Sequence, residues 1–267
     1  MKRVLSIQDL SCFGKCSLTV ALPVLSAMGC NTAVLPTALL STHTAFSAPY
    51  SKDLTENLLP ITQHWKQVGA EFDVIGVGYL ANPEQAETVA CVLEEFPGIV
   101  VADPVMGDHG KQYTGITAAH VDAVAKLCRR ANVLLPNVTE ACLLTGIPYE
   151  ESPDEAYYKN LLRAMKTFGA ETIILTGASF SKGQTGVMGI DGEKIFSYQT
   201  PKLPYSCHGT GDLFAAVVMG GLALGKKPEQ AAALAADFVY RVLDATKESS
   251  PFGVDFESQL PWLWESL

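Results

Sequence analysis

The nine residues His208-Gly209-Thr210-Gly211-Asp212-Leu213-Phe214-Ala215-Ala216 decide how the rest of the chain is interpreted. Two glycines flank a threonine, an aspartate follows, and the apolar run 213–224 begins at once. Because this run consists of good helix formers, we expect a helix that starts at Gly211-Asp212. The first turn of a helix presents unpaired N–H groups and a partial positive charge, and glycines let an anion approach the backbone closely. The stretch therefore predicts an anion-binding helix start.

Asp212 has two explanations in this position. Aspartate is a common N-cap, which satisfies a free N–H group at a helix start. It could instead act as a general base beside a bound phosphate. Taken alone, the stretch favours the cap, so the remaining sequence must decide between the two.

The rest of the chain alternates strand-like with helix-like runs. Apolar runs at 3–7, 32–40, 73–77, 98–102, 133–135 and 172–175 predict strands, and runs at 15–28, 54–68, 83–96, 118–130, 138–144, 156–168 and 228–242 predict helices. Asp191-Gly192, between strands expected at 185–190 and 194–199, is a strong hairpin signal. This alternation predicts an α/β fold in one domain, residues 1–267, with a mostly parallel sheet, helices on both faces and an antiparallel edge hairpin.

Polar residues follow directly on several predicted strands. They are Asp9, Thr44, Tyr79, Asp103, Asn137 and Thr176. Ligands of open parallel sheets bind beyond the carboxyl ends of the strands. The one-sided distribution of these residues is therefore the main physical argument for an active site.

Asp103 opens the segment Asp103-Pro104-Val105-Met106-Gly107-Asp108 after a buried strand. A carboxylate there can hold Mg²⁺, which prefers few carboxylates together with water and substrate phosphate. Aspartate before proline is also ordinary turn chemistry, and the two interpretations weigh equally.

Asn137-Val138-Thr139-Glu140 is expected to begin a helix directly after a strand and Pro136. Asparagine is a good N-cap, and glutamate three residues later completes a capping box, which is the favoured interpretation. Glu140 would also point toward the expected ligand edge, so a second role stays open.

Other motifs are weak or absent. Gly76-Val77-Gly78-Tyr79-Leu80-Ala81 matches a dinucleotide-binding fingerprint, but the helix is expected to start too late, near Asn82-Pro83. Tyr79 is better interpreted as a ring that can stack on a flat ligand. The sequence contains no GxxxxGK[ST], GxSxG or HExxH motif. His43, His109 and His208 lie in predicted loops, where lone histidines are mostly solvated.

Composition excludes several classes of protein. A hydrophobic fraction of 48% and a charged fraction of 18% indicate a globular chain. The net charge of −9 argues against bulk binding to nucleic acid or anionic membranes. No apolar stretch approaches the length of about 18 residues that spanning a membrane requires. The seven cysteines form no CxxC pair and favour a cytoplasmic setting, with Cys91, Cys128 and Cys142 expected as buried thiols in helices.

Two of these motifs carry a resemblance to a known group of enzymes. Gly209-Thr210-Gly211-Asp212 resembles the anion-hole motif of the ribokinase-like superfamily of small-molecule kinases, and Asn137–Glu140 resembles its NxxE motif. Within that superfamily the chain most resembles pyridoxal (vitamin B6) kinases. The further segments that carry this likeness are Ser6-Ile7-Gln8, Ser41-Thr42-His43-Thr44, Gly78-Tyr79 and 103–108. The resemblance extends in the same order from about Arg3 to Leu243, and it implies a ribokinase-like three-layer sandwich.

The resemblance also implies catalytic roles. Asp212 would take the proton from the hydroxymethyl group of the vitamin. The backbone N–H groups of Gly209, Thr210, Gly211 and Asp212 would stabilise the charge on the transferred phosphoryl group. Asp103 and Glu140, partly through water, would organise Mg²⁺ on ATP. Such roles fit phosphoryl transfer, which depends mainly on positioning and electrostatic stabilisation.

Binding roles follow from the same resemblance. Asn137, Thr176 and Thr210 would contact the phosphates, with Leu203 near the nucleotide base. Thr44, Tyr79 and His208 would line the pyridine pocket.

The chain departs from the family pattern at three positions. Asp9 stands where serine usually follows Ile-Gln; its carboxylate could accept a hydrogen bond from the ring substituents or pair with a protonated amine, which would favour pyridoxamine. Leu135 replaces the threonine usual before Pro-Asn, and Gly177 replaces the serine usual after Thr176, so the ATP contacts at both positions are weakened. Hydroxymethylpyrimidine kinases of thiamine synthesis, which share the fold and chemistry, therefore stay open.

The sequence thus predicts a cytoplasmic, Mg²⁺- and ATP-dependent kinase of a B6 vitamer. Hydroxymethylpyrimidine kinase is the first alternative, and the set Asp9, Thr44 and His208 should decide between the two. A non-catalytic vitamer- or nucleotide-binding protein is disfavoured because Asp212 is present, and an NAD-dependent oxidoreductase is disfavoured by the late helix start. The resemblance also suggests a homodimer and allows a monovalent cation such as K⁺. No nucleic acid or membrane partner is expected.

Overall fold

A central sheet organises the computed structural model, which describes residues 1–44, 46–247 and 250–267. Within these residues the strand order is β11-β10-β9-β8-β5-β4-β1-β2-β3. The parallel strands are β1 (Arg3–Ser11), β2 (Asn31–Leu40), β4 (Val74–Val77), β5 (Ile99–Ala102), β8 (Val133–Leu134) and β9 (Thr172–Ala178). Antiparallel strands close both edges, namely β3 (Ser51–Asp53) on one side and β10 (Gln184–Asp191) with β11 (Lys194–Pro201) on the other.

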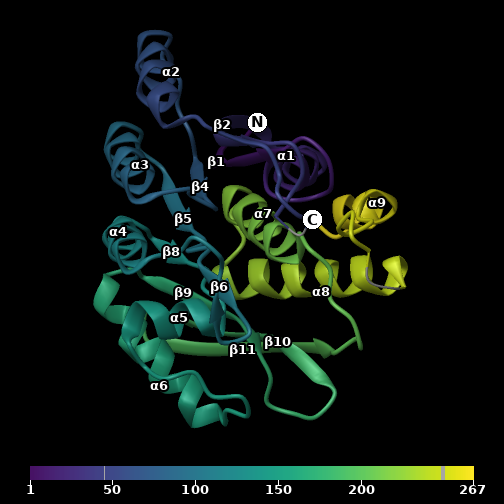
Figure 1. Cartoon of the computed structure of the whole chain (residues 1–267). Helices are drawn as coiled ribbons and strands as arrows, with labels where there is room; N and C mark the ends of the chain where they lie inside the picture. The colour runs from purple at the N-terminus through teal and green to yellow at the C-terminus, as the bar shows by residue number, and fades with distance from the viewer. Residues whose placement is uncertain (45, 248–249) are drawn as a thin grey trace.

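Helices cover both faces of this sheet (Figure 1). One face carries α1 (Leu18–Ala27), α7 (Thr210–Ala223) and α8 (Pro228–Thr246), with η2 (Glu257–Gln259) and α9 (Leu260–Glu265) packed beside them. The other face carries α2 (Thr55–Gln67), α3 (Pro83–Glu95), α4 (Ala118–Cys128), α5 (Val138–Thr145), α6 (Glu155–Met165) and η1 (Lys166–Phe168). The predicted three-layer α/β sandwich is confirmed.

Alternation along the central strands builds two hydrophobic cores. In β4, Val74 faces the core under α1, α7 and α8, whereas Ile75 faces the core under α2–α6, and both are fully buried. Successive side chains of a strand point to opposite faces, so a continuous apolar run is what a doubly covered strand requires. The same cores hold the carboxyl ends of β1, β4, β5 and β8 side by side.

The structure corrects several sequence-based boundaries. The hairpin at Asp191-Gly192 is confirmed, but β3 and the small hairpin of β6 (Gly107–Asp108) and β7 (Lys111–Gln112) were missed. These strands are too short to show a periodic pattern. Asp9 lies inside β1 rather than after it, and Thr176 lies inside β9. Helix α1 begins at Leu18, not Lys15, because Ser17 has φ 52°, which no helical residue can adopt.

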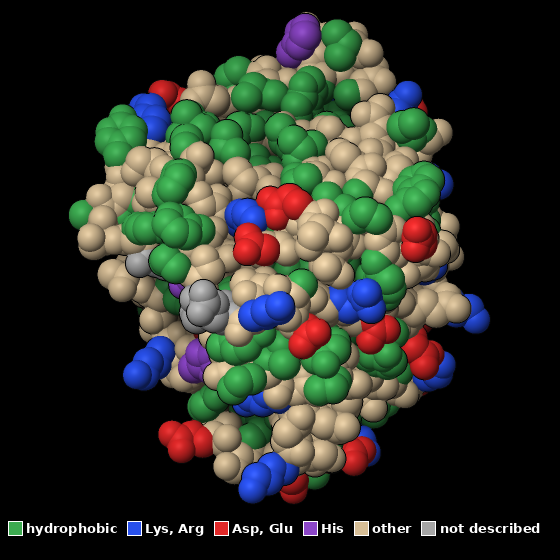
Figure 2. All heavy atoms as spheres, turned by 90° about the vertical axis from the view of Figure 1, so that its right-hand side faces the viewer, with side chains coloured by type: hydrophobic (Ala, Val, Ile, Leu, Met, Phe, Trp, Pro, Cys, Tyr) green, Lys and Arg blue, Asp and Glu red, His purple; other side chains and the backbone are tan. Residues whose placement is uncertain are grey.

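The described cysteines differ in their exposure at the surface. Cys128 and Cys142 are buried as predicted, whereas Cys91 is exposed because it lies on the outer side of α3. None of the helices in the described ranges is long and apolar enough to cross a membrane. Figure 2 shows a face on which Lys and Arg side chains lie among Asp and Glu side chains, and on which apolar side chains gather in the upper part.

Candidate active site

The N-terminus of α7 lies at the carboxyl edge of the sheet. Gly209 precedes the helix with φ 90°, and no side chain caps the first turn. A Cβ on Gly209 would lie 2.6 Å from the carbonyl oxygen of Lys15, so the position requires glycine on two grounds. A Cβ on Gly211 would meet nothing within 4 Å. The space beside Gly211 is therefore open and no side chain caps the helix start, as an anion site requires.

Asp212 is not a cap. It lies in the first turn of α7, and its Oδ2 accepts hydrogen bonds from the backbone N–H of Ser17 at 2.8 Å and from the thiol of Cys16 at 3.3 Å. Thr210 uses its hydroxyl within the turn, where it donates to the Cys207 carbonyl at 3.3 Å. The cap interpretation of Asp212 is wrong, because the loop between β1 and α1 supplies the partners of its carboxylate.

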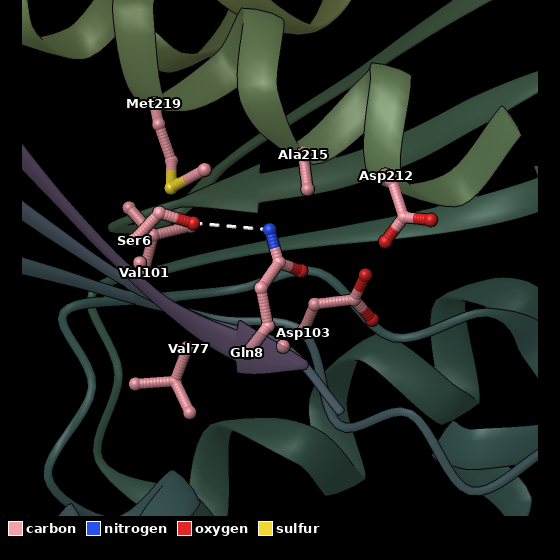
Figure 3. Close-up of a pocket in the computed structure, with 10 residues that line it drawn as sticks. Ser6, Gln8, Val77, Val101, Asp103, Asp212, Ala215 and Met219 are labelled. Carbon is pink, nitrogen blue, oxygen red and sulfur yellow. Dashed lines mark hydrogen bonds between the residues drawn. The ribbon is translucent and has the colours of Figure 1, made fainter. Parts of the chain in front are cut away.

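Asp212 and Asp103 point toward each other beside a small cavity (Figure 3). Asp103 follows β5, and the cavity wall is completed by Ser6, Gln8, Gly76, Val77, Gly78, Val101, Ala215 and Met219. Burial and then the negative charge of Asp212 raise the pKa of Asp103. Burial also raises the pKa of Asp212, and the hydrogen bonds from Ser17 and Cys16 oppose that rise. Two carboxylates with weakened acidity thus face one space.

Asn137 and Glu140 form the predicted capping box at the start of α5. The side chain of Asn137 accepts from the Glu140 N–H at 3.0 Å, and Glu140 Oε2 accepts from the Asn137 N–H at 2.9 Å. Glu140 Oε1 accepts from the Met106 N–H at 3.1 Å, which ties the segment after Asp103 to α5. Burial and the charge of Asp103 raise the pKa of Glu140 well above its ordinary value.

Asp103 and Glu140 offer carboxylates for a cation site. The described residues hold no group of three or more His, Cys, Asp and Glu side chains arranged around one metal position. Both Glu140 oxygens already accept backbone N–H bonds, so Glu140 is suited to contact a metal through water. The charge of Asp103 raises the pKa of Glu140, and a cation beside Asp103 would offset this repulsion. The pair therefore fits an ion such as Mg²⁺, which keeps most of its water and uses few carboxylates.

The residues predicted to contact ATP form a second group. Asn137, which follows β8, and Thr176 of β9 are joined by an isolated parallel bridge, and the Thr176 N–H donates to the Pro136 carbonyl at 2.9 Å. The amide of Asn137 also donates to the Gly107 carbonyl at 2.8 Å. Leu203 lies half-buried between β11 and α7. The structure brings Asn137 and Thr176 together.

Asp9 of β1 is near enough to Asp212 to sense its charge and is only 3% exposed. It accepts hydrogen bonds from the hydroxyls of Ser17 at 2.5 Å and Ser11 at 3.2 Å. Burial is the main cause that raises its pKa to about 6, and the charge of Asp212 contributes. Tyr79 is close enough for the charge of Asp9 to raise its pKa as well, although burial contributes more.

His208 packs on His43, with ring centroids 5.2 Å apart and the planes at 26°. His43 is 2% exposed, so the interpretation of a solvated loop histidine is wrong for this residue. Phe46 lies against His43 at 4.9 Å, and Phe13 and Phe252 extend the same aromatic cluster. Thr44 is exposed next to His43.

Sequence reasoning missed two residues of the site, Cys16 and Ser17. They were counted in a helix because apolar residues follow at helical spacing. Their contacts with Asp212 join positions about 195 residues apart, which no local pattern reveals. Gly76 and Gly78 also have a packing explanation, because a Cβ there would meet Met219 and Gln8. Helix α3 starts only at Pro83, so these glycines do not open a dinucleotide-binding helix.

The fold and the site together define a class of enzyme. The molecule is a ribokinase-like phosphotransferase that acts on an alcohol group, with a carboxylate at an uncapped helix start and further carboxylates at the ends of parallel strands. The chain belongs to the phosphomethylpyrimidine kinase family, whose model matches residues 22–254.

Relatives and solved structures agree with this assignment. The chain is 28% identical to a pyridoxine/pyridoxal/pyridoxamine kinase of Bordetella pertussis, over 92% of this chain and 90% of the relative. The pyridoxal kinase of Lactobacillus plantarum has 33% identity and a TM-score of 0.92, covering 99% of this chain and 97% of that one. A candidate phosphomethylpyrimidine kinase of Bacteroides thetaiotaomicron, in a crystal form with pyridoxal, has 32% identity and a TM-score of 0.93, covering 98% and 95%.

Proposed function

We propose that this protein is an ATP- and Mg²⁺-dependent kinase that phosphorylates the hydroxymethyl group of a B6 vitamer. The observation that carries the proposal is the position of Asp212 in the first turn of α7. Its carboxylate does not cap the helix; it is held by Ser17 and Cys16 and faces Asp103. Relatives that act on pyridoxal, pyridoxine and pyridoxamine support this choice of substrate.

Asp212 would act as the general base. It would accept the proton of the substrate hydroxyl as that oxygen attacks the γ-phosphorus of ATP. The bond from the γ-phosphorus to the bridging oxygen then breaks, and ADP leaves. The raised pKa of Asp212 suits this role, because a carboxylate that is less acidic than usual is a stronger base.

The N–H groups of Gly209, Thr210, Gly211 and Asp212 would stabilise the negative charge that moves across the transferred phosphoryl group. Asp103, with Glu140 through water, would hold Mg²⁺, which neutralises phosphate charge when bound. Asn137, Thr176 and Thr210 would contact the phosphates and Leu203 the nucleotide base. The same expectation allows a monovalent cation such as K⁺.

The flat ring of the vitamer would lie among Thr44, Tyr79 and His208, close to Asp9. The ring of His43 stacks on the ring of His208. Asp9, with a pKa of about 6, is mostly ionised at neutral pH, as pairing with a protonated amine requires. Family membership also underlies our expectation of a homodimer that works in the cytoplasm.

Hydroxymethylpyrimidine is the second candidate substrate. The matching family model is named for phosphomethylpyrimidine kinase, and a hydroxymethylpyrimidine/phosphomethylpyrimidine kinase of Haemophilus influenzae is 33% identical over 61% of this chain. An ATP-consumption assay with pyridoxal, pyridoxamine, pyridoxine and hydroxymethylpyrimidine decides which of these compounds is the substrate. Turnover of hydroxymethylpyrimidine alone would show that it, and not a B6 vitamer, is the substrate. Turnover of none of the four compounds would refute the proposed activity.

Substitution of the base tests the mechanism. Asp212→Asn keeps the shape and the acceptor oxygen for Ser17 but cannot take a proton, so kcat should fall by about 10²–10⁴-fold. Asp122→Asn, an exposed change on α4, is the matched control and should keep wild-type kcat. Unchanged turnover in Asp212→Asn would remove Asp212 from the mechanism.

A further inference from the structure

Ser17 has a backbone conformation that side-chain-bearing residues rarely adopt. It lies directly before α1 with φ 52° and ψ −123°, and it is 3% exposed. Such a conformation costs about 1–3 kcal/mol and persists only where neighbouring contacts enforce it. One of these contacts is an isolated antiparallel bridge between Ser17 and Leu10, which fixes the residue against β1.

The side chain of Ser17 does not perform the usual task of a serine before a helix. It makes no capping hydrogen bond to α1. Its hydroxyl instead donates to Asp9 Oδ1 at 2.5 Å, while its backbone N–H donates to Asp212 Oδ2 at 2.8 Å. One strained residue thus connects a carboxylate of β1 with a carboxylate of α7.

The two oxygens of Asp212 are consequently not equivalent. The N–H of Ser17 and the thiol of Cys16 both donate to Oδ2. Among the residues that the structure describes, no group donates to Oδ1. The loop therefore fixes one oxygen of the carboxylate and leaves the other available.

We propose that Ser17 is a positioning residue for the base: its hydroxyl, anchored on Asp9, holds its own N–H against Oδ2 of Asp212, so that Oδ1 is presented to the substrate alcohol. The inference rests on the proposed kinase function. In the transfer step the hydroxyl proton passes to Oδ1, the alcohol oxygen bonds to the γ-phosphorus, and ADP leaves with the electrons of the broken bond. Cys16 assists by occupying the same oxygen as Ser17.

The chain provides a matched control for this role. Ser11 also donates its hydroxyl to Asp9, at 3.2 Å, and it is equally buried, but it makes no contact with Asp212. Loss of either hydroxyl removes one hydrogen bond from Asp9. Only the loss at Ser17 also releases the peptide that holds Asp212. A comparison of the two positions therefore separates an effect on the charge of Asp9 from an effect on the position of Asp212.

The experiment measures kcat and the KM for ATP of wild type, Ser17→Ala, Ser17→Gly, Ser17→Thr and Ser11→Ala, with the thermal midpoint of each. Wild-type turnover is established first on the vitamers and hydroxymethylpyrimidine. Without any turnover the proposed function fails, and this inference fails with it. With turnover, Ser17→Ala should lower kcat by about 10- to 100-fold while the KM for ATP changes by less than about twofold.

The other variants exclude a merely structural role. Ser17→Gly relieves the backbone strain, so it should keep or raise the thermal midpoint and still lose kcat. Ser17→Thr retains the hydroxyl and should keep more of the wild-type kcat than Ser17→Ala, while its β-branched side chain at this φ should lower the thermal midpoint. Ser11→Ala should keep the wild-type kcat. Wild-type kcat in both Ser17→Ala and Ser17→Gly would overturn the proposal. An equal loss of kcat in Ser11→Ala would also overturn it, because the effect would then act through Asp9 alone.

Discussion

Burial of Asp9 in the folded protein disfavours the ionised form of its carboxyl group. Its pKa of about 6 exceeds the ordinary value of 3.8 mainly because of burial. A group whose pKa is raised by folding binds more protons in the folded than in the unfolded state between these two values. The free energy of unfolding should therefore fall as the pH rises through this window, by at most about 3 kcal/mol.

Asp9→Asn should remove this pH dependence. The amide oxygen can still accept from Ser17, but no buried charge forms, so the variant should be more stable than wild type by about 1–3 kcal/mol near pH 8. Near pH 4 the two proteins should be about equally stable, because Asp9 is then largely protonated in the folded state. Urea unfolding at both pH values measures the difference. A constant difference between the two would contradict the ascribed pKa.

At the residue scale, the sequence predicted candidate site residues that belong to local motifs and missed residues whose roles depend on contacts with distant parts of the chain. Asp103, Asn137 and Asp212 were predicted as site residues because they follow strands or glycines. Ser17 and His43 were not, since their roles depend on Asp212, Asp9 and His208, which are distant in the chain.

At the element scale, the start of α7 separates a glycine needed for folding from one needed for binding. Gly211→Val would place methyl groups where the phosphate is expected, while the Cβ itself meets no neighbour. We expect a KM for ATP raised by about tenfold or more and a lower kcat, with the thermal midpoint nearly unchanged.

Gly209→Ala is the contrasting change. Its Cβ would lie 2.6 Å from the Lys15 carbonyl at a φ of 90°, so stability should fall by about 1–3 kcal/mol. Thermal unfolding and steady-state kinetics of both variants test the distinction. Normal ATP binding in Gly211→Val would contradict the anion hole.

Long elements were predicted well because their apolar period is sustained, as in α3, α4 and α8. The start of α1 was misjudged because a single strained residue, Ser17, stops the helix against the local pattern. The short strands β3, β6 and β7 depend on partners elsewhere in the fold rather than on their own composition.

At the scale of the whole molecule, the two ends of the chain meet around the loop that holds Asp212. The Lys15 N–H donates to the Phe252 carbonyl at 2.8 Å, and the Lys15 ammonium lies 2.7 Å from both Asp255 and Glu257. Asp255→Asn with Glu257→Gln should cost only about 1 kcal/mol or less in global stability, since both carboxylates are exposed.

The loop around Lys15 should lose more order in this double variant than the small change in global stability suggests. Hydrogen exchange at the amide of Lys15 should become about tenfold faster in this double variant, while the amides of α7 should keep their protection. Mass spectrometry of the peptide that contains Lys15 provides the measurement. Exchange at the wild-type rate would show that the two ion pairs do not order the loop.

The carbonyl of Lys15 lies against two glycines, and Gly253 approaches it as closely as Gly209 does, since a Cβ on either would stand 2.6 Å away. One half of this contact comes from Gly253, which lies after the whole of α7 in the sequence. During translation, every strand of the sheet and the whole of α7 leave the ribosome before the segment around Gly253 does. The contacts that close the Lys15 loop therefore become possible only after the sheet and α7 have been synthesised.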